Sequence, residues 1–364
     1  MNFMNLADNV FLVELHAELI NPDEKPILNA TVPQKPGKKG SLLLDCGAVK
    51  FMNGLGAFQL VKLDVLARQR GQRLLAFGVN RHFRDILKVT GLDRAIMIYD
   101  SRAEAFTAAG ITPDKQPPTD IESNPSFDMT FWSKPVVTLT VPEMPPQALN
   151  RNMQGRQVVG PVDGFGQLWQ KTYRLVIDRP GLTPQKVIKA LKQNLPAFQP
   201  PYNRFYPSPR GIAPGEVVAI DSSTPGGPVS TGVLVLYADD VSFTFMTPQG
   251  HPESGWVTFS AFEENGKIIA QIIGLARAND FVYEVAFHAV GSKMQVNTWK
   301  TVLASLAKYL EIPADVTVEP VCIDKHLQWS QTGNVWYNAQ IRTLFYVPFR
   351  RMKKSRKDGK TKGK

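Results

Sequence analysis

The chain has 364 residues, of which 43% are hydrophobic and 20% charged, a globular composition and a length that favours more than one domain. No run approaches the roughly 18 apolar residues of a membrane helix, and the start lacks the basic and apolar segments of a signal peptide. The formal net charge of +10 is concentrated in residues 350–364, which hold nine basic side chains and one acid, so the other 349 residues carry only +2.

The first predicted domain spans residues 9–110, with strands and helices in alternation. Residues 11–19 alternate apolar and polar side chains, as a strand with one buried face does. Four prolines disfavour a full helix over residues 21–40. Further strands are expected at 41–45, 73–77 and 95–99, and helices at 53–71, 80–90 and 101–109.

In its spacing and in the phrase GLDRAIMIYDSRAEAF (residues 91–106), the window 41–109 resembles the STAS domain of anti-sigma factor antagonists and sulphate-transporter tails. The resemblance implies an α/β fold that docks a protein partner, for example a kinase-like anti-sigma factor. In phospho-switched members of the family, the turn before the first of these helices reads Asp-Ser-Ser-Gly, and the second serine takes the phosphate. Here the turn is Asn53-Gly54-Leu55-Gly56, with Leu55 at the acceptor position.

Two readings of this turn are open. A helix N-terminus presents free N–H groups that attract anions, so Asn53, Gly54, Leu55 and Gly56 are predicted to bind a partner without a phosphoserine switch. Alternatively, they form a tight strand-to-helix turn and nothing more. Ser41 and Ser101 lie elsewhere and do not replace the missing hydroxyl.

Residues 111–158 are predicted to be a linker, because eight prolines fall between Pro113 and Pro146 and no helical period is present. One short strand is expected at 136–141. The later part is expected to dock onto the second domain, because Phe131 and Trp132 would be costly to leave in water.

The second predicted domain spans residues 159–348 and has an α+β pattern. Thr183 and Pro184 open a helix that runs to Leu195. A second helix is expected at 295–310, and Asn265-Gly266 supplies a hairpin turn. Strands are expected at 170–178, 216–220, 229–237, 241–246, 256–262, 268–275, 281–288, 316–323 and 334–347.

The phrase TPQGHPESGWVTFSAFEENGKIIAQIIGLARAND (residues 247–280) resembles an uncharacterised family of the START-like, helix-grip (SRPBCC) superfamily. The resemblance implies a curved sheet that grips a long helix, often with an apolar cavity between them, and brings no established reaction. A predicted ligand pocket would be lined by Trp299, Leu303, Leu306, Ile272 and Val285. If the space is filled, the same residues are ordinary core.

Other candidate sites are weaker. His251 and Glu253 can form an acid–base pair, but a surface turn in which His251 bonds a carbonyl is favoured. For Cys322 and His326, a buried structural thiol beside an exposed imidazole is favoured over a nucleophile or zinc site. Aromatic residues early in the second domain either pack the core or line a cavity: Trp169, Tyr173, Tyr202, Phe205 and Tyr206.

The sequence thus predicts a non-catalytic regulatory protein that binds a partner through a STAS-like module and requires no cofactor or metal. The alternative is an enzyme or a binding protein for a small apolar, lipid-like ligand, centred on the second domain. Cys46 and Cys322 suggest no disulfide framework, which fits the cytoplasm. The tail, 349–364, is predicted to be disordered, with at most weak contact with nucleic acid or anionic lipid.

Overall fold

The computed structural model describes residues 2–15, 18–19, 40–112, 129–141, 148 and 152–346. The chain divides into two compact units, Met1–Pro135 and Val136–Lys364. The expectations for residues 21–39 and for the basic tail fall outside the described residues.

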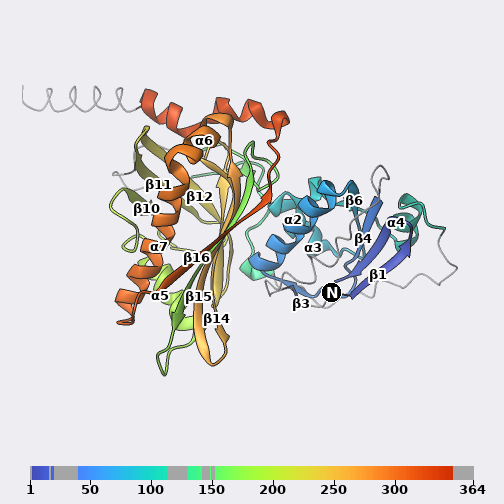
Figure 1. Ribbon diagram of the computed structural model, residues 1–364, viewed down its shortest axis with the longest axis horizontal. Helices are drawn as coiled ribbons and strands as arrows, with labels where there is room; N and C mark the ends of the chain where they lie inside the picture. The colour runs from blue at the N-terminus through green and yellow to red at the C-terminus, as the bar shows by residue number, and fades with distance from the viewer. Residues whose placement is uncertain are drawn as a thin grey trace, which may run out of the picture. The chain divides into compact units, whose positions relative to one another are not determined.

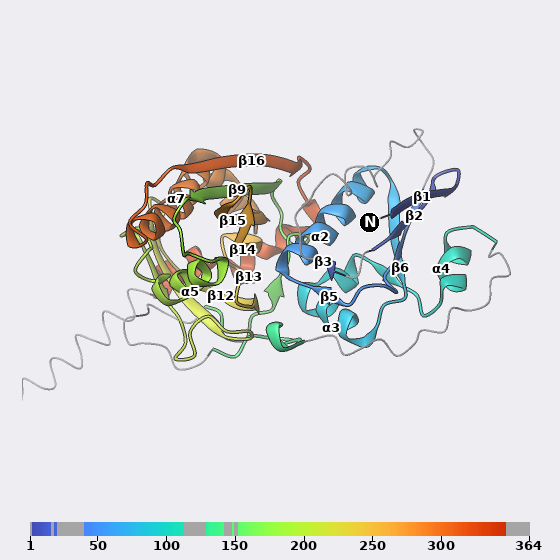
Figure 2. The same ribbon diagram turned by 90° about the horizontal axis from the view of Figure 1, so that it is seen from below.

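The first unit is built on a five-stranded sheet in the order β1-β2-β4-β6-β7. From β2 onward the neighbouring strands are parallel, whereas β1 pairs antiparallel with β2. Helices α2 and α3 lie on one face of the sheet and α4 on the other (Figures 1 and 2). The strands are β1 (Asn2–Ala7), β2 (Val10–Glu14), β4 (Gly40–Asp45), β6 (Gln72–Phe77) and β7 (Met97–Ile98), with β3 (Glu18–Leu19) and β5 (Phe51–Met52) paired separately; the helices are α2 (Gly54–Gln69), α3 (Arg81–Thr90) and α4 (Arg102–Ala108).

Local capping explains why the predicted helices of this unit are confirmed. Asn53 Oδ1 accepts from the amides of the first turn of α2, and Asn80 Oδ1 accepts from Phe83 N at 2.8 Å in α3. Helix α3 ends at Gly91, whose φ of 73° is the left-handed conformation that glycine adopts without strain. Strand β1 was not predicted, the strand expected at 11–19 is interrupted, and the one at 95–99 is reduced to β7.

The predicted strand at 136–141 is wrong. Leu139 instead exchanges backbone hydrogen bonds with Gly155 and Arg156, which lie in a turn and so cannot extend a ladder. Leu139 and Val141 still pack on the second unit, in a buried cluster with strand residues of the sheet. Trp132, however, donates from Nε1 to the Met52 carbonyl at 3.0 Å, so it belongs to the first unit and not, as expected, to the second.

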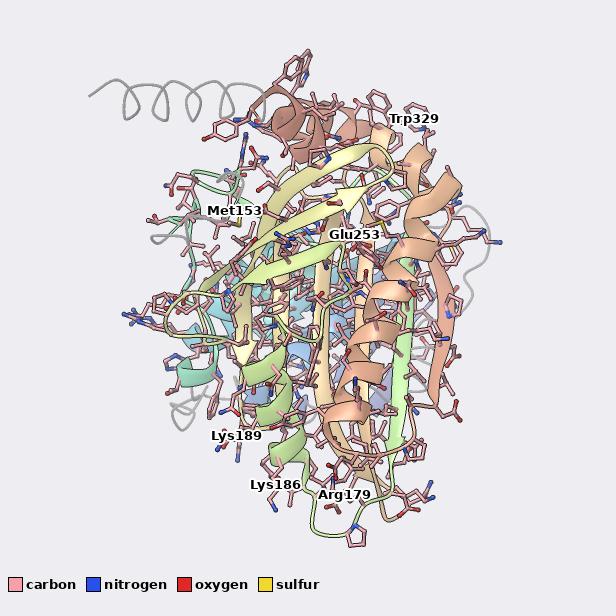
Figure 3. The ribbon with its side chains drawn as sticks, turned by 90° about the vertical axis from the view of Figure 1, so that its left-hand side faces the viewer. Met153, Arg179, Lys186, Lys189, Glu253 and Trp329 are labelled. Carbon is pink, nitrogen blue, oxygen red and sulfur yellow. The ribbon has the colours of Figure 1, made fainter. Side chains whose placement is uncertain are left out.

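The second unit is an antiparallel sheet in the order β10-β11-β12-β13-β14-β15-β9-β16, with β8 paired to β13. Helices α5 and α7 lie side by side over one face of this sheet (Figure 3). The strands are β8 (Val158–Val159), β9 (Leu168–Ile177), β10 (Asn203–Tyr206), β11 (Val217–Thr224), β12 (Gly227–Ala238), β13 (Ser242–Pro248), β14 (Glu253–Glu264), β15 (Lys267–Ala278) and β16 (Val316–Asp324); the helices are α5 (Pro184–Asn194), α6 (Phe281–Ala286) and α7 (Ser292–Tyr309).

Two predicted strands of this unit are helical, and in each case a cap explains the error. Residues 281–288 form α6 and a π-helical turn, η3 (Phe287–Gly291), because Asp280 Oδ1 accepts from Val282 N and Tyr283 N. Residues 334–346 belong to a 3₁₀ helix, η4 (Trp329–Tyr337), and to a helical segment, 339–346, where Asn338 Oδ1 accepts from Ile341 N at 3.0 Å. Local side-chain bonds here outweigh β-branched and aromatic composition.

Candidate functional sites

The turn predicted to bind a partner is buried. Asn53 is 6% exposed and Leu55 4% exposed. Asn53 Oδ1 accepts from both Leu55 N and Gly56 N at 3.0 Å, so these two N–H groups are already bonded within the turn. In this conformation residues 53–56 do not present an open docking surface, and a charge at Leu55 would be buried.

Exposed residues lie beside this turn, at the edge of the sheet where the carboxyl ends of β4 and β6 meet. Strands β4 and β6 are parallel, so the loops that follow them open on the same edge of the sheet. Gly47, Ala48, Lys50 and Arg81 are exposed there, and we call these four residues the carboxyl edge. Gly78 joins the two loops closely, since its φ is 69° and a Cβ would lie 2.7 Å from Gly47 N.

The two serines considered in the sequence, Ser41 and Ser101, do not replace the missing hydroxyl. Ser41 is 3% exposed inside β4. Ser101 Oγ caps α4 and accepts from Glu104 N at 3.2 Å. Neither hydroxyl occupies the position of Leu55.

A cavity of about 360 Å³ lies in the second unit, between the sheet and the N-terminal half of α7. Residues from β10 to β15, from α6, η3 and α7, and from the segment 339–346 line it. Of the predicted pocket residues only Trp299 lines this cavity. Leu303, Leu306 and Ile272 are fully buried core, and Val285 is 69% exposed on α6.

Side-chain size explains which half of α7 faces the cavity. The C-terminal half packs in the same core as Phe243, Phe245 and Phe259, whose rings fill the space. Opposite the N-terminal half, Gly255 pairs with Ala276 and Val257 pairs with Gly274. A Cβ on Gly274 would meet nothing closer than 4.0 Å. The hollow therefore exists because small residues stand where β14 and β15 face the helix.

The aromatic residues predicted as either core or lining divide between the two. Phe205 lines the 360 Å³ cavity, whereas Tyr173 is buried in the core. Tyr202 donates from its hydroxyl to Met294 O at 3.3 Å, at the first turns of α7. Trp169 lines the second cavity described below, and Tyr206 packs against the buried cluster that contains Leu139 and Val141.

One wall of the cavity carries a chain of polar side chains. Lys171 Nζ donates to Gln295 Oε1 at 2.5 Å and to Ser292 Oγ at 2.9 Å, and Gln295 Nε2 donates to Glu253 Oε1. Burial raises the pKa of Glu253 to about 7, against the opposing charge of Lys171. Burial likewise lowers the pKa of Lys171. Figure 3 labels Glu253 in the interior, between the sheet and α7.

The same polar chain borders a second cavity of about 320 Å³. Glu253, Gln295, Gly274 and Ala276 line both cavities, and Lys171 lines the second. The turn η3 also contributes to both; such π-helical turns occur frequently at functional sites. The arrangement suits a ligand with an apolar body and one hydrogen-bonding group, which would meet Glu253 or Gln295.

His251 and Glu253 do not form the acid–base pair considered above. His251 Nδ1 lies 3.0 Å from both Glu253 N and Glu253 O, so the imidazole bonds the backbone and not the carboxyl group. Burial lowers the pKa of His251 to about 4, which leaves the ring neutral near pH 7. His251 thus lies in a turn and contacts a neighbouring carbonyl, as expected, but both side chains are partly buried and also line the cavity. Gly250 is required there, since a Cβ would lie 1.9 Å from Tyr337 O.

The segment around Cys322 contains a buried ion pair that the sequence did not reveal. Arg277 Nη2 donates to Asp324 Oδ2 at 2.5 Å, and its other nitrogens donate to the carbonyls of Pro161, Gly166 and His326. Burial favours a higher pKa for Asp324, but bonds from Arg277 and His326 more than offset it and hold the pKa at about 2. Cys322 is partly exposed rather than buried, and the His326 side chain is 83% exposed.

Glu253→Gln is expected to raise the free energy of unfolding by about 1–3 kcal/mol near pH 8. The folded pKa of about 7 exceeds the ordinary value of 4.5, so the stability from this carboxyl is fully present below about pH 4.5. It is lost as the pH rises through about 7, and glutamine avoids that loss. Urea unfolding of both chains between about pH 4.5 and 8 measures the difference.

Glu263→Gln, an exposed change on the same strand, is the control and should give no such gain. A stability difference between Glu253→Gln and wild type that does not vary with pH would contradict the raised pKa.

Within the described residues, no cluster of three or more His, Cys, Asp or Glu side chains is suited to a metal ion. None of the helices in that part of the chain combines the length and apolar character that a bilayer crossing needs.

Comparison with known proteins gives one family match, and it falls within the first unit. The family model of the STAS domain matches residues 8–105. Solved structures similar to the chain include a sulfate transporter family protein of Wolinella succinogenes, at 17% identity over 29% of this chain and 89% of that one, with a TM-score of 0.26. An anti-sigma factor antagonist-like protein of Thermotoga maritima is 18% identical over 29% and 92%, with a TM-score of 0.25.

A further similar structure is StfQ, a di-domain ARO/CYC of the steffimycin biosynthetic pathway, at 10% identity and a TM-score of 0.30. The match covers 40% of this chain and 53% of StfQ, so the chain spans about half the length of that protein. No curated protein matches the chain.

Proposed function

We propose that this chain is a non-catalytic regulatory protein whose STAS domain docks a protein partner without a phosphoserine switch. The observation that carries the proposal is the STAS match over residues 8–105 with leucine, not serine, at position 55. Because Leu55 is buried, the partner meets the exposed carboxyl edge beside it. Both cysteines are free thiols, which fits the cytoplasm as the compartment of this protein.

Ala48→Glu is expected to weaken partner binding at least about tenfold, because it places a charge that must be desolvated in the interface. Ala48 is exposed, so folding should not change. Affinity is measured by calorimetry with the partner recovered from the native host. Ala103→Glu, the same change at an exposed position of α4, is the control.

Equal affinity of Ala48→Glu and wild type would remove the carboxyl edge from the interface. Phosphate on a serine or threonine of the first unit that releases the partner would overturn the absence of a switch.

The cavity supports a second function, the uptake of a small amphiphilic ligand by the second unit. An antiparallel sheet with α5 and α7 across one face supports our placement of this unit among the START-like helix-grip folds. The 360 Å³ cavity has the size and mostly apolar lining of a small-molecule site, and Glu253 with Gln295 provides its polar end. With a ligand in the second unit and a protein partner on the first, the chain would act as a ligand-responsive regulator.

A further inference from the structure

An apolar surface lies at one end of the second unit. We call it the apolar cap; its exposed side chains are Phe281 and Val285 of α6, Trp329 and Trp336 of η4, and Ile341, Leu344 and Phe345 of the segment 339–346. Trp336 is 82% exposed and Phe345 71% exposed. Isolated exposed apolar residues are ordinary, but a cluster of this kind marks an interaction site.

The elements that carry the cap are held together at one end of the unit. Phe165 makes edge-on ring contacts with both Phe281, at 6.5 Å between centroids, and Trp329, at 5.4 Å. Gln340 N donates to the Tyr283 hydroxyl at 3.0 Å and so ties the segment 339–346 to α6. Figures 1 and 3 show these helical segments together at the same end of the unit.

The segment 339–346 points its apolar side chains outward. Ala339 and Thr343, one turn apart, are buried, and Thr343 Oγ1 donates to Ala339 O. Ile341, Leu344 and Phe345 occupy the opposite, exposed face. A helix at a water-exposed surface normally carries polar residues there, so this face is suited to an apolar environment.

The charge of the sequence that follows the cap favours an anionic lipid bilayer as that apolar environment. The sequence continues directly from the cap into residues 350–364, with nine basic side chains and one acid. A basic segment next to exposed tryptophan, phenylalanine and aliphatic side chains matches the two contributions by which peripheral proteins bind anionic bilayers. Nucleic acid would use the basic residues and the rings, but the aliphatic side chains Val285, Ile341 and Leu344 would gain nothing from it.

We propose that the apolar cap and the basic tail dock the second unit on the surface of a lipid bilayer that contains anionic lipids. The aromatic side chains would enter the headgroup region, and the basic side chains would neutralise lipid phosphates and carboxylates.

Docking also has a consequence for the cavity, and this consequence alone rests on the proposed ligand uptake. Tyr283, Phe287 and Gln340 line the cavity and belong to α6, η3 and the segment 339–346. Two of the elements that would meet the bilayer, α6 and the segment 339–346, therefore also line the cavity, so an amphiphile would pass between them.

The test is co-sedimentation of the full chain with phosphatidylcholine vesicles that contain or lack phosphatidylserine. The full chain is expected to bind only the vesicles with phosphatidylserine. Trp336→Ser and Phe345→Ser should each weaken that binding about tenfold, the factor for losing the burial of one large apolar side chain. Val137→Ser, which removes an 83% exposed apolar side chain outside the cap, should leave binding unchanged.

Deleting residues 350–364 should abolish the preference for phosphatidylserine and leave the melting temperature unchanged. Failure of the full chain to bind phosphatidylserine vesicles would overturn the proposal. So would wild-type vesicle binding by the Trp336→Ser/Phe345→Ser double variant, or binding to a single-stranded oligonucleotide more tightly than to the vesicles. Ligand uptake by the cavity is measured separately with a soluble apolar probe, so a failure of bilayer docking does not decide whether the cavity binds a ligand.

Discussion

Arg277→Met is expected to lower the free energy of unfolding of the second unit by about 3–5 kcal/mol. The substitution keeps an unbranched chain of similar length but removes the charge opposite Asp324. It also leaves the carbonyls of Pro161, Gly166 and His326 without the bonds that Arg277 donates. A buried carboxylate without its partner costs several kcal/mol, which is the main part of the loss.

Arg210→Met is the matched control, because the Arg210 side chain is 82% exposed and pairs with Glu216 at 3.3 Å. Because the Arg210 guanidinium remains in water, a pair of this kind contributes at most about 1 kcal/mol, although Glu216 is only 15% exposed. Urea unfolding near neutral pH compares the two variants, and a loss no larger for Arg277→Met than for Arg210→Met would contradict the structural role of the buried pair.

The Arg277–Asp324 pair also makes an acid-dependent contribution. The folded pKa of Asp324, about 2, lies below the ordinary 3.8. The contribution of the Asp324 carboxylate to the free energy of unfolding is therefore present above about pH 3.8 and is lost as the pH falls through about 2. In Arg277→Met this depression should largely disappear, so that part of the acid dependence should disappear with it.

Gly274→Leu is expected to abolish binding of apolar probes to the second unit. Gly274 lines both cavities, and a Cβ there meets nothing closer than 4.0 Å, so the new side chain has room to enter the hollow. Filling a cavity displaces its ligand, whereas the glycine adopts no conformation that leucine must avoid. Fluorescence titration with an anilinonaphthalene probe measures the loss.

Thr317→Leu adds the same side chain at an exposed position of β16, outside both cavities and outside the apolar residues of α6 and η4, and should bind the probe as wild type does. Gly274→Ala should give an intermediate loss. Probe affinity independent of residue size at position 274 would place the ligand elsewhere.

Elements whose ends carry strong local signals could be predicted from the sequence. Asn80 and Gly91 bound α3, Thr183 and Pro184 open α5, and Asn265-Gly266 turns the β14–β15 hairpin with φ values of 51° and 74°. The error at α6 arose because aromatic and β-branched residues outweighed Asp280, whose capping bonds decide the local structure.

The site was harder to predict, because it depends on which residues face one another across the sheet. Leu303 and Trp299 lie on the same helix, yet only Trp299 meets the cavity, because Phe259 fills the space beside the core half of α7. Lys171 and Glu253 are far apart in the sequence and are linked through Gln295 of α7, which bonds both side chains. The sequence did single out Glu253, from the motif at residues 250–253, but gave no sign that it lies in a cavity wall.

Native mass spectrometry of the full chain, purified gently from its native host, tests most directly whether this is a regulatory binding protein without a phosphate switch. We expect a complex with a protein partner, no phosphate on the first unit, and loss of the complex in Ala48→Glu but not in Ala103→Glu. A chain that carries no protein partner, or a phosphorylated first unit whose dephosphorylation changes partner binding, would contradict it.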